Sequence, residues 1–210
     1  MENQEKHLEN LTEIRSMMER SSRFISLNGL SGVFAGVFAL IGAAITQFYI
    51  INPFLNPQPS DHLWVSLNLN YAAMRVAVVA GFVLVASLTV GYLFTSRKAK
   101  KKGLPIWDAT AKRLLINIMI PLATGGIFCG ILFLHEVFLL IAPATLIFYG
   151  LALVNASKYT LHDIRALGIC EIILGLIATA AYNYGLIIWA VGFGLLHIVY
   201  GTAMYYKYER

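Results

Sequence analysis

Two ionisable side chains, Glu171 and His197, stand inside apolar stretches near the C-terminal end of the sequence. Each is 13 residues from Tyr184, which lies in the short turn sequence between the two stretches. A helix rises about 1.5 Å per residue, so both side chains should lie roughly 20 Å from that turn. Adjacent antiparallel helices would bring the acid and the imidazole to one depth, where they could form a proton-sensitive pair. We therefore expect a ligand or proton site at Glu171 and His197.

The surroundings of this pair can be anticipated from the cost of burying charge. A carboxylate in lipid is unfavourable, so Glu171 should be protonated, paired or in contact with water. In a hydrocarbon core of about 30 Å, the pair would lie roughly 10 Å from the cytoplasmic edge. One hypothesis is that the pair lines an inward-facing polar pocket. The alternative is purely structural, with Glu171 bonded to a neighbouring helix and His197 bonded to a backbone carbonyl.

Other arrangements that carry chemistry are missing from the sequence. It contains no Gly-rich phosphate loop, no activated-nucleophile motif and no histidine cluster with metal-ligand spacing. His135 and Glu136 begin like a zinc-protease motif, but the second histidine is absent, because Leu139 stands in its place. We therefore expect no catalytic residues, no metal and no cofactor, and we expect that the protein is not an enzyme.

The elements that position the pair follow from composition. Of 210 residues, 58% are hydrophobic and only 13% are charged, whereas soluble domains carry about 25% charged residues. Several apolar runs approach the roughly 20 residues needed to cross a bilayer as a helix. These runs predict an all-α integral membrane protein with a transmembrane domain over residues 24–210. The six expected spans are about 25–51, 72–95, 114–134, 137–156, 166–182 and 185–206.

Charge gives the expected orientation of these spans. With the N-terminus in the cytoplasm, fifteen basic residues fall on the inner side and Arg75 alone falls on the outer side. The inner residues are Lys6, Arg15, Arg20, Arg23, Arg97, Lys98, Lys100, Lys101, Lys102, Lys112, Arg113, Lys158, Arg165, Lys207 and Arg210. Cytoplasmic loops carry an excess of Lys and Arg, so both termini should be cytoplasmic. The basic run after the second span is therefore expected to set orientation rather than to bind nucleic acid.

Residues 1–23 precede the spans and are polar but patterned. Leu8, Leu11, Ile14 and Met18 recur at helical spacing, which predicts an amphipathic helix. This helix would lie on the cytoplasmic interface or under the bundle, or it would dock a cytoplasmic protein partner. The other expected partners are the lipid bilayer and, as a further option, a second copy of the chain.

The six spans can be arranged as three consecutive helical hairpins. Each hairpin starts just after a basic residue, and glycines recur four residues apart, which lets helices approach closely. The glycines expected to pack are Gly32, Gly36, Gly126, Gly130 and Gly175. In this alignment Glu171 takes the place of the first glycine in the third hairpin. The alternative is that apolar hairpins resemble one another by chance.

This layout, over the whole chain, resembles that of small six-helix bacterial inner-membrane proteins, including the acid-stress membrane-protein type. The resemblance implies the fold and a bacterial inner membrane, and it carries no function onto a numbered residue. We expect a non-enzymatic sensory or structural membrane protein that acts through its cytoplasmic segments, because polar groups within the spans are few. The alternative is a transporter or channel component with an inward-facing polar pocket at Glu171 and His197.

Overall fold

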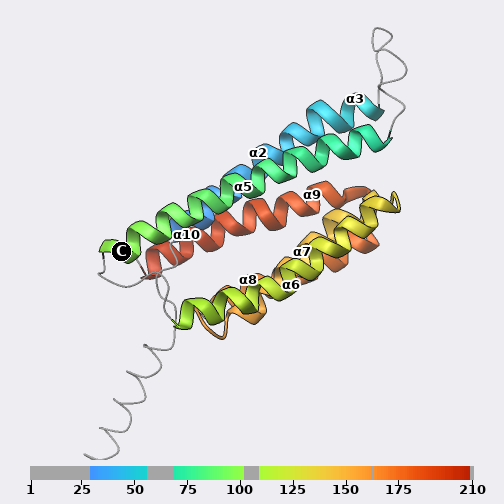
Figure 1. The fold of residues 1–210 in the computed structure, drawn as a ribbon. Helices are drawn as coiled ribbons and strands as arrows, with labels where there is room; N and C mark the ends of the chain where they lie inside the picture. The colour runs from blue at the N-terminus through green and yellow to red at the C-terminus, as the bar shows by residue number, and fades with distance from the viewer. Residues whose placement is uncertain (1–28, 56–68, 102–108, 162, 209–210) are drawn as a thin grey trace, which may run out of the picture.

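A computed structural model describes residues 29–55, 69–101, 109–161 and 163–208 of the chain. The regular structure in these ranges is helical throughout, and they contain no strand. The helices run side by side along one axis (Figure 1). The amphipathic helix predicted over residues 1–23 lies outside the described residues, as does most of the outer segment that follows the first span.

The helices in chain order are mostly longer than the spans expected from the sequence. Their bounds are α2 (Gly29–Thr46), the π-helical η1 (Gln47–Ile51), α3 (Asn52–Leu55), α5 (Leu69–Lys101), α6 (Ala109–Leu134), the 3₁₀ turn η2 (Phe138–Leu140), α7 (Ile141–Ala156), α8 (Asp163–Ala180), the 3₁₀ turn η3 (Tyr182–Tyr184), α9 (Gly185–Trp189), the π-helical η4 (Ala190–Leu196) and α10 (His197–Tyr208). The last three helical segments follow one another without a break, so they form one long helix with a π-helical centre.

Five helices in the described part are long and apolar enough to cross a membrane. They are Gly29–Ile51, Leu69–Lys101, Ala109–Leu134, Phe138–Ala156 and Gly185–Tyr208. The remaining long helix, α8, has 18 residues and includes Asp163, Arg165 and Glu171. These three charged side chains fall within its only 18 residues, whereas each of the five contains an apolar stretch of 18 residues with at most two. A sixth span therefore remains a prediction.

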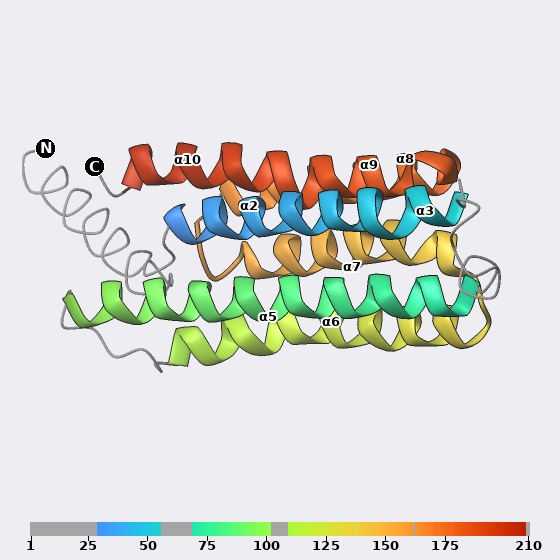
Figure 2. The same ribbon diagram turned by 90° about the horizontal axis from the view of Figure 1, so that it is seen from above.

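The helices form two groups that meet at η4. In one group α2 packs against both α5 and α10, and in the other α7 packs against both α6 and α8 (Figure 2). The segment η4 lies against α2 and also contacts α8, while α9 contacts α7 and α8. The region around η4 is therefore where side chains from four helices can meet.

Three of the glycines expected to pack do lie at helix contacts. A methyl group at Gly36 would lie 2.6 Å from the carbonyl oxygen of Gly194, and one at Gly32 would lie 3.3 Å from the α-carbon of Gly201. A methyl group at Gly175 would lie 2.6 Å from a side-chain carbon of Ile147. These positions need glycine because a neighbouring helix occupies the space of a side chain.

The packing role expected of Gly126 and Gly130 is wrong for the described part of the chain. A methyl group at either position would meet no described atom within 4 Å. The neighbouring Gly125 makes the contact instead, because the ring of Phe148 from α7 fills the space beside its α-carbon. Successive residues of a helix point about 100° apart, so the face of α6 that packs against α7 is the one that carries Gly125 and not the one that carries Gly126 and Gly130.

A proline within α6 is matched by a side-chain hydrogen-bond donor from the neighbouring helix α7. A proline has no N–H, so it leaves the carbonyl four residues earlier without its helical donor. Pro121 in α6 leaves the carbonyl of Asn117, and the side-chain amide of Asn155 in α7 donates to that oxygen at 2.9 Å. The helix continues through the proline because its free carbonyl is bonded from outside.

Near the other end of the bundle, the guanidinium of Arg75 in α5 donates a hydrogen bond to the carbonyl of Tyr49 at 3.3 Å. Tyr49 belongs to the π-helical η1, which ends at Ile51, two residues before Pro53. The first span was expected to end at about residue 51, but α3 continues through Pro53 to Leu55.

The turn between α6 and η2 is tight, as the gap of two residues, His135 and Glu136, between the expected third and fourth spans predicts. The N–H of Val137 donates to the carbonyl of Leu132, and the N–H of Glu136 donates to that of Phe133, which is a Schellman motif. Glu136 takes the left-handed conformation, with φ of 60°. Its carboxylate also accepts a hydrogen bond from Asn70 of α5 at 2.9 Å, which ties the turn to a second helix.

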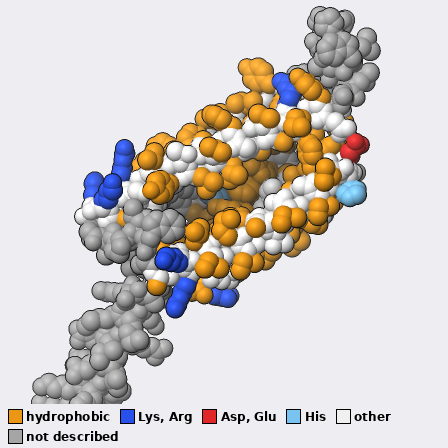
Figure 3. All heavy atoms as spheres, viewed as in Figure 1, with side chains coloured by type: hydrophobic (Ala, Val, Ile, Leu, Met, Phe, Trp, Pro, Cys, Tyr) orange, Lys and Arg blue, Asp and Glu red, His pale blue; other side chains and the backbone are white. Residues whose placement is uncertain are grey.

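Apolar side chains cover the sides of the bundle, and basic side chains gather toward one end (Figure 3). The exposed apolar residues include Phe82 of α5, Ile127 of α6 and Ile187 of α9. An apolar exterior of this extent is suited to lipid rather than to water.

Candidate functional site

Glu171 and His197 come together in the centre of the structure. Glu171 is on α8 and is fully buried, with 0% of its surface exposed, and His197 begins α10 with 7% exposed. The Nδ1 atom of His197 lies 3.4 Å from Oε1 of Glu171. The equal depth inferred by counting from Tyr184 therefore corresponds to a contact between the two side chains.

The two ring nitrogens of His197 have different partners. Nδ1 is 3.0 Å from the carbonyl oxygen of Gly192, and Nε2 is 2.8 Å from the hydroxyl oxygen of Tyr149 on α7. A carbonyl oxygen can only accept a hydrogen bond, so Nδ1 carries the proton in this arrangement. In the neutral ring Nε2 then accepts from the hydroxyl of Tyr149, and both nitrogens are satisfied.

The carboxyl group of Glu171 differs from the imidazole of His197, because neither of its oxygens has a hydrogen-bond partner in the described part of the chain. Oε2 lies close to the backbone of η4, since a methyl group added at Gly192 would be 2.5 Å from it. Most buried polar side chains have a partner, so an unpaired carboxyl calls for an explanation. The simplest explanation is that the carboxyl group exchanges a proton with Nδ1 of His197, which lies 3.4 Å from Oε1.

The π-helical segment η4 positions both members of this pair. It ends directly before His197, and its Gly192 supplies both the carbonyl for Nδ1 and the space for Glu171. A longer π-helical stretch inside an α-helix is rare and is often found at functional sites. Its other glycine, Gly194, contacts the side chain of Leu40 on α2, so the segment is held from both sides.

Aromatic rings connect the pair to the neighbouring turn of the same helix. Trp189, Phe193 and His197 are four residues apart, with ring centroids separated by 4.9 Å and then 5.7 Å. Tyr149 packs against both Phe193 and His197, at 4.9 Å and 5.4 Å. The indole N–H of Trp189 donates to the hydroxyl of Thr145 at 3.2 Å. A movement of the His197 ring would therefore change the environment of the Trp189 indole.

A hydrogen-bonded contact at one end of the bundle joins the same two helices that carry the pair. Asp163 begins α8, and Lys207 and Tyr208 end α10. The carboxylate of Asp163 accepts from Lys207 at 2.9 Å and from the hydroxyl of Tyr208 at 2.9 Å. The helices α8 and α10 are thus linked at two levels, one buried and one exposed.

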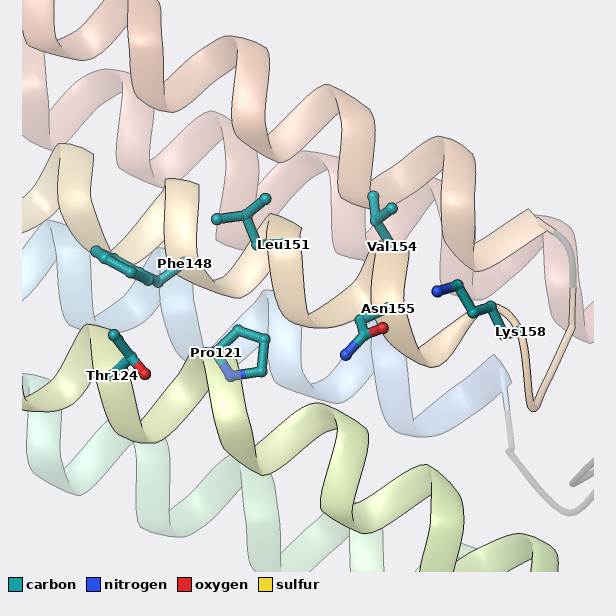
Figure 4. A pocket seen from close by; sticks show the side chains of 7 residues that line it. All are labelled: Pro121, Thr124, Phe148, Leu151, Val154, Asn155 and Lys158. Carbon is teal, nitrogen blue, oxygen red and sulfur yellow. The ribbon is translucent and has the colours of Figure 1, made fainter.

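A pocket among the described residues lies away from the pair, between α6 and α7. It has a volume of about 400 Å³ and is lined by Pro121, Thr124, Phe148, Leu151, Val154, Asn155 and Lys158 (Figure 4). Glu171 and His197 are not among these residues, and both are enclosed. An inward-facing polar pocket at the pair thus stays a prediction.

The side chains of this site can form hydrogen bonds and transfer protons. Within the described ranges, no group of three His, Cys, Asp or Glu side chains is placed to hold a metal ion. The carboxyl, the imidazole and the phenol of Tyr149 can exchange protons and hydrogen-bond partners with one another.

Sequence reasoning missed Tyr149, Gly192 and Phe193. The spacing of Phe193 from Trp189 and His197 was a usable signal, because residues four apart share a helix face. No comparable signal existed for Tyr149, since its contact with His197 depends on how α7 lies against α10.

No protein-family model, curated protein or solved structure matches this chain.

Proposed function

We propose that this chain is a proton-responsive membrane protein of the sensory kind and not an enzyme. The observation that carries the proposal is the fully buried carboxyl of Glu171, which has no hydrogen-bond partner in the described chain and lies 3.4 Å from His197. Buried acids within membrane helices commonly mark proton or ion sites. Among the described residues both side chains are buried, and the pocket between α6 and α7 does not include them, which favours sensing over the passage of a substrate.

The response would come from competition for the Nδ1 proton of His197. That N–H faces two acceptors, the carbonyl of Gly192 at 3.0 Å and the carboxyl of Glu171 at 3.4 Å. An ionised Glu171 attracts the proton more strongly, because charged acceptors make stronger hydrogen bonds than neutral ones. A protonated Glu171 loses this advantage, and the proton stays with Gly192. The two states therefore differ in how α8 is held against η4 and α10.

The change in protonation would be transmitted to the end of the bundle where Asp163 contacts Lys207. The site and this contact join the same pair of helices, α8 and α10. The contact is eight residues from Glu171 along α8 and ten residues from His197 along α10. A small movement between these helices would therefore alter the exposed contact and the C-terminal residues beside it. A protein partner bound by residues 1–23 at this side would receive the signal.

The proposal includes six spans in three hairpins, with α8 as the fifth span and both termini in the cytoplasm of a bacterial cell. The support is the packing of α8 along α7, together with the gathering of charge at one end. The ends of α5 and α10 and the start of α6 carry Lys101, Lys207 and Lys112. Basic residues favour the cytoplasmic side, so this end is assigned to the cytoplasm of the inner membrane.

The experiment uses Trp189 as a reporter. Replacing Trp64 and Trp107 with Phe leaves Trp189 as the single tryptophan, and the protein is reconstituted in lipid nanodiscs. We expect its emission to change as the pH falls from about 8 to about 5, the range in which histidine pairs commonly respond. Glu171→Gln should abolish the change, because glutamine cannot bind or release a proton in this range.

The control for this titration is His135→Asn, which removes a histidine at the far turn and should leave the change intact. A titration that persists unaltered in Glu171→Gln would end the proposal. A Trp189 signal that is flat in the parent protein across this range would also end it, and would leave a structural role for the pair.

A transporter or channel component is the second candidate, and the interrupted helix favours it. Discontinuous membrane helices often mark transport sites, and η4 interrupts the α-helical pattern beside Glu171. Transport requires the site to open to water from one side at a time. Pulsed labelling of Phe193→Cys by water-soluble reagents, in a chain with Cys129 and Cys170 replaced by Ala, would detect that opening, and a sensor without a pathway would show none.

A further inference from the structure

The pocket between α6 and α7 is a groove between two points of contact. Toward one end, the amide of Asn155 donates to the carbonyl and the side-chain oxygen of Asn117, at 2.9 Å and 3.4 Å. Toward the other end, the ring of Phe148 lies against Gly125. The helices separate between these contacts, where Pro121 stands in α6 (Figure 4).

The walls of the groove are suited to a hydrocarbon chain. Leu151, Val154 and Phe148 supply apolar surface, and the hydroxyl of Thr124 is already bonded to the carbonyl of Ile120 at 2.8 Å. The polar atoms of the walls are therefore largely occupied by the protein itself. A polar ligand would find few partners along this length.

The charge lies at one end of the groove. Lys158 lines it directly and follows Asn155 by three residues, and Arg113 precedes Asn117 by four. Because Asn155 and Asn117 are bonded to each other, the two cations lie within about one helical turn of the same contact. Neither cation forms an ion pair with another residue of the described ranges. As far as the described residues go, this end therefore presents positive charge without a counter-ion.

The length of the groove matches one leaflet of a bilayer. From Lys158 to Phe148 is ten residues, or about 15 Å along a helix. Half of a hydrocarbon core of about 30 Å is the same distance. A chain lying in the groove would therefore run from the level of the head groups to the middle of the membrane.

We propose that this groove binds one acyl chain of an anionic phospholipid, with the phosphate beside Lys158 and Arg113. Apolar walls, one leaflet of length and uncompensated cations at the head-group end are the features that such a lipid complements. The site is independent of Glu171 and His197, so either proposal can fail without the other.

The test is photocrosslinking in nanodiscs that contain a trace of lipid with a photoactivatable acyl chain. The probe is phosphatidylglycerol, compared with the phosphatidylcholine analogue, and labelled peptides are mapped by mass spectrometry. We expect the phosphatidylglycerol probe to label the stretch from Phe148 to Asn155 in excess over the zwitterionic probe. Leu151→Trp fills the groove and should remove most of this labelling, whereas Leu176→Trp, on the exposed face of α8, should not.

The charge requirement is tested by Lys158→Gln, which should lower the preference for phosphatidylglycerol about fivefold. The matched control is Lys101→Gln at the end of α5, which should leave the preference unchanged. Equal labelling by the two probes in the unaltered protein would overturn the proposal. A photoactivatable amino acid at Leu151 tests for other occupants, and its crosslinking to residues 1–23 or to a second copy would also overturn the proposal.

Discussion

Gly36 lets α2 lie directly against the backbone of η4, the segment that carries the carbonyl for His197. An added methyl group would meet the carbonyl oxygen of Gly194 at 2.6 Å and the N–H nitrogen of Ile198 at 3.1 Å. Backbone atoms cannot move aside as a flexible side chain can, so the two helices would have to separate. Gly126 is the contrasting case, because an added methyl group there meets no described atom within 4 Å.

Substitution of these two glycines should therefore have opposite effects. We expect Gly36→Ala to lower the free energy of unfolding by about 1–3 kcal/mol through overpacking. Gly126→Ala should raise it by about 0.5–1 kcal/mol, because alanine favours the helix. Steric-trapping measurements in micelles would give both values. A similar loss in both variants would contradict the packing described for α6.

Single residues also show which features of the site and of its packing can be predicted from the sequence and which cannot. The common depth of Glu171 and His197 was predicted because it needs only the helical rise and the position of the turn. The roles of Gly126 and Gly130 were mispredicted because a spacing of four defines a face and not what lies against it. Tyr149 was missed because its contact with His197 depends on the register between helices distant in the chain.

At the scale of helices, side chains of one helix donate hydrogen bonds to backbone carbonyls of its neighbour. Asn155 donates to the carbonyl that Pro121 leaves free, and Arg75 donates to a carbonyl of the π-helical η1. In hydrocarbon an unbonded carbonyl is costly, so a proline in a span is tolerated where another group bonds the freed oxygen. Asn155 thus has a role in α6 although it belongs to α7.

This pairing predicts a non-additive double-mutant cycle. Asn155→Ala alone should lower the free energy of unfolding by about 1–3 kcal/mol, because it leaves the Asn117 carbonyl unbonded. In a Pro121→Ala background the helix itself donates to that carbonyl, so the same substitution should cost less than about 1 kcal/mol. Costs that add without coupling in unfolding measurements would show that Asn155 does not compensate for the proline.

Helix ends were predicted less well than helix existence, for a physical reason. The second span was expected to end at residue 95, but α5 continues to Lys101 through a run of basic residues. Lysine and arginine are good helix formers, so charge marks where the lipid ends and not where the helix ends. The apolar length of a span is visible in sequence, whereas its continuation into water is not.

At the scale of the whole molecule, the placement of charge supports the proposed orientation of the bundle in the membrane. Arg75 lies near the start of α5, while the cations of the described helices otherwise sit at the opposite end of the bundle. The turns at His135 and at Tyr184 should then face one side of the membrane, and Lys158 the other. This arrangement requires α8 to cross the membrane in spite of its polar residues.

Cysteine accessibility in intact cells checks this arrangement. In a chain with Cys129 and Cys170 replaced by Ala, we expect an impermeant maleimide to label His135→Cys and Tyr184→Cys from outside. It should label Lys158→Cys only after the membrane is permeabilised. Labelling of Tyr184→Cys only after permeabilisation would place that turn inside and would remove α8 from the spans.

We propose that Glu171 takes up and releases a proton inside the bundle, and infrared difference spectroscopy can detect this change. The spectrum of reconstituted protein at low pH minus that at neutral pH should contain the C=O stretch of a protonated carboxylic acid in an apolar environment. We predict that Glu171→Gln removes this band and that Glu136→Gln, at the exposed turn, retains it. An identical band in the Glu171→Gln protein would contradict the account.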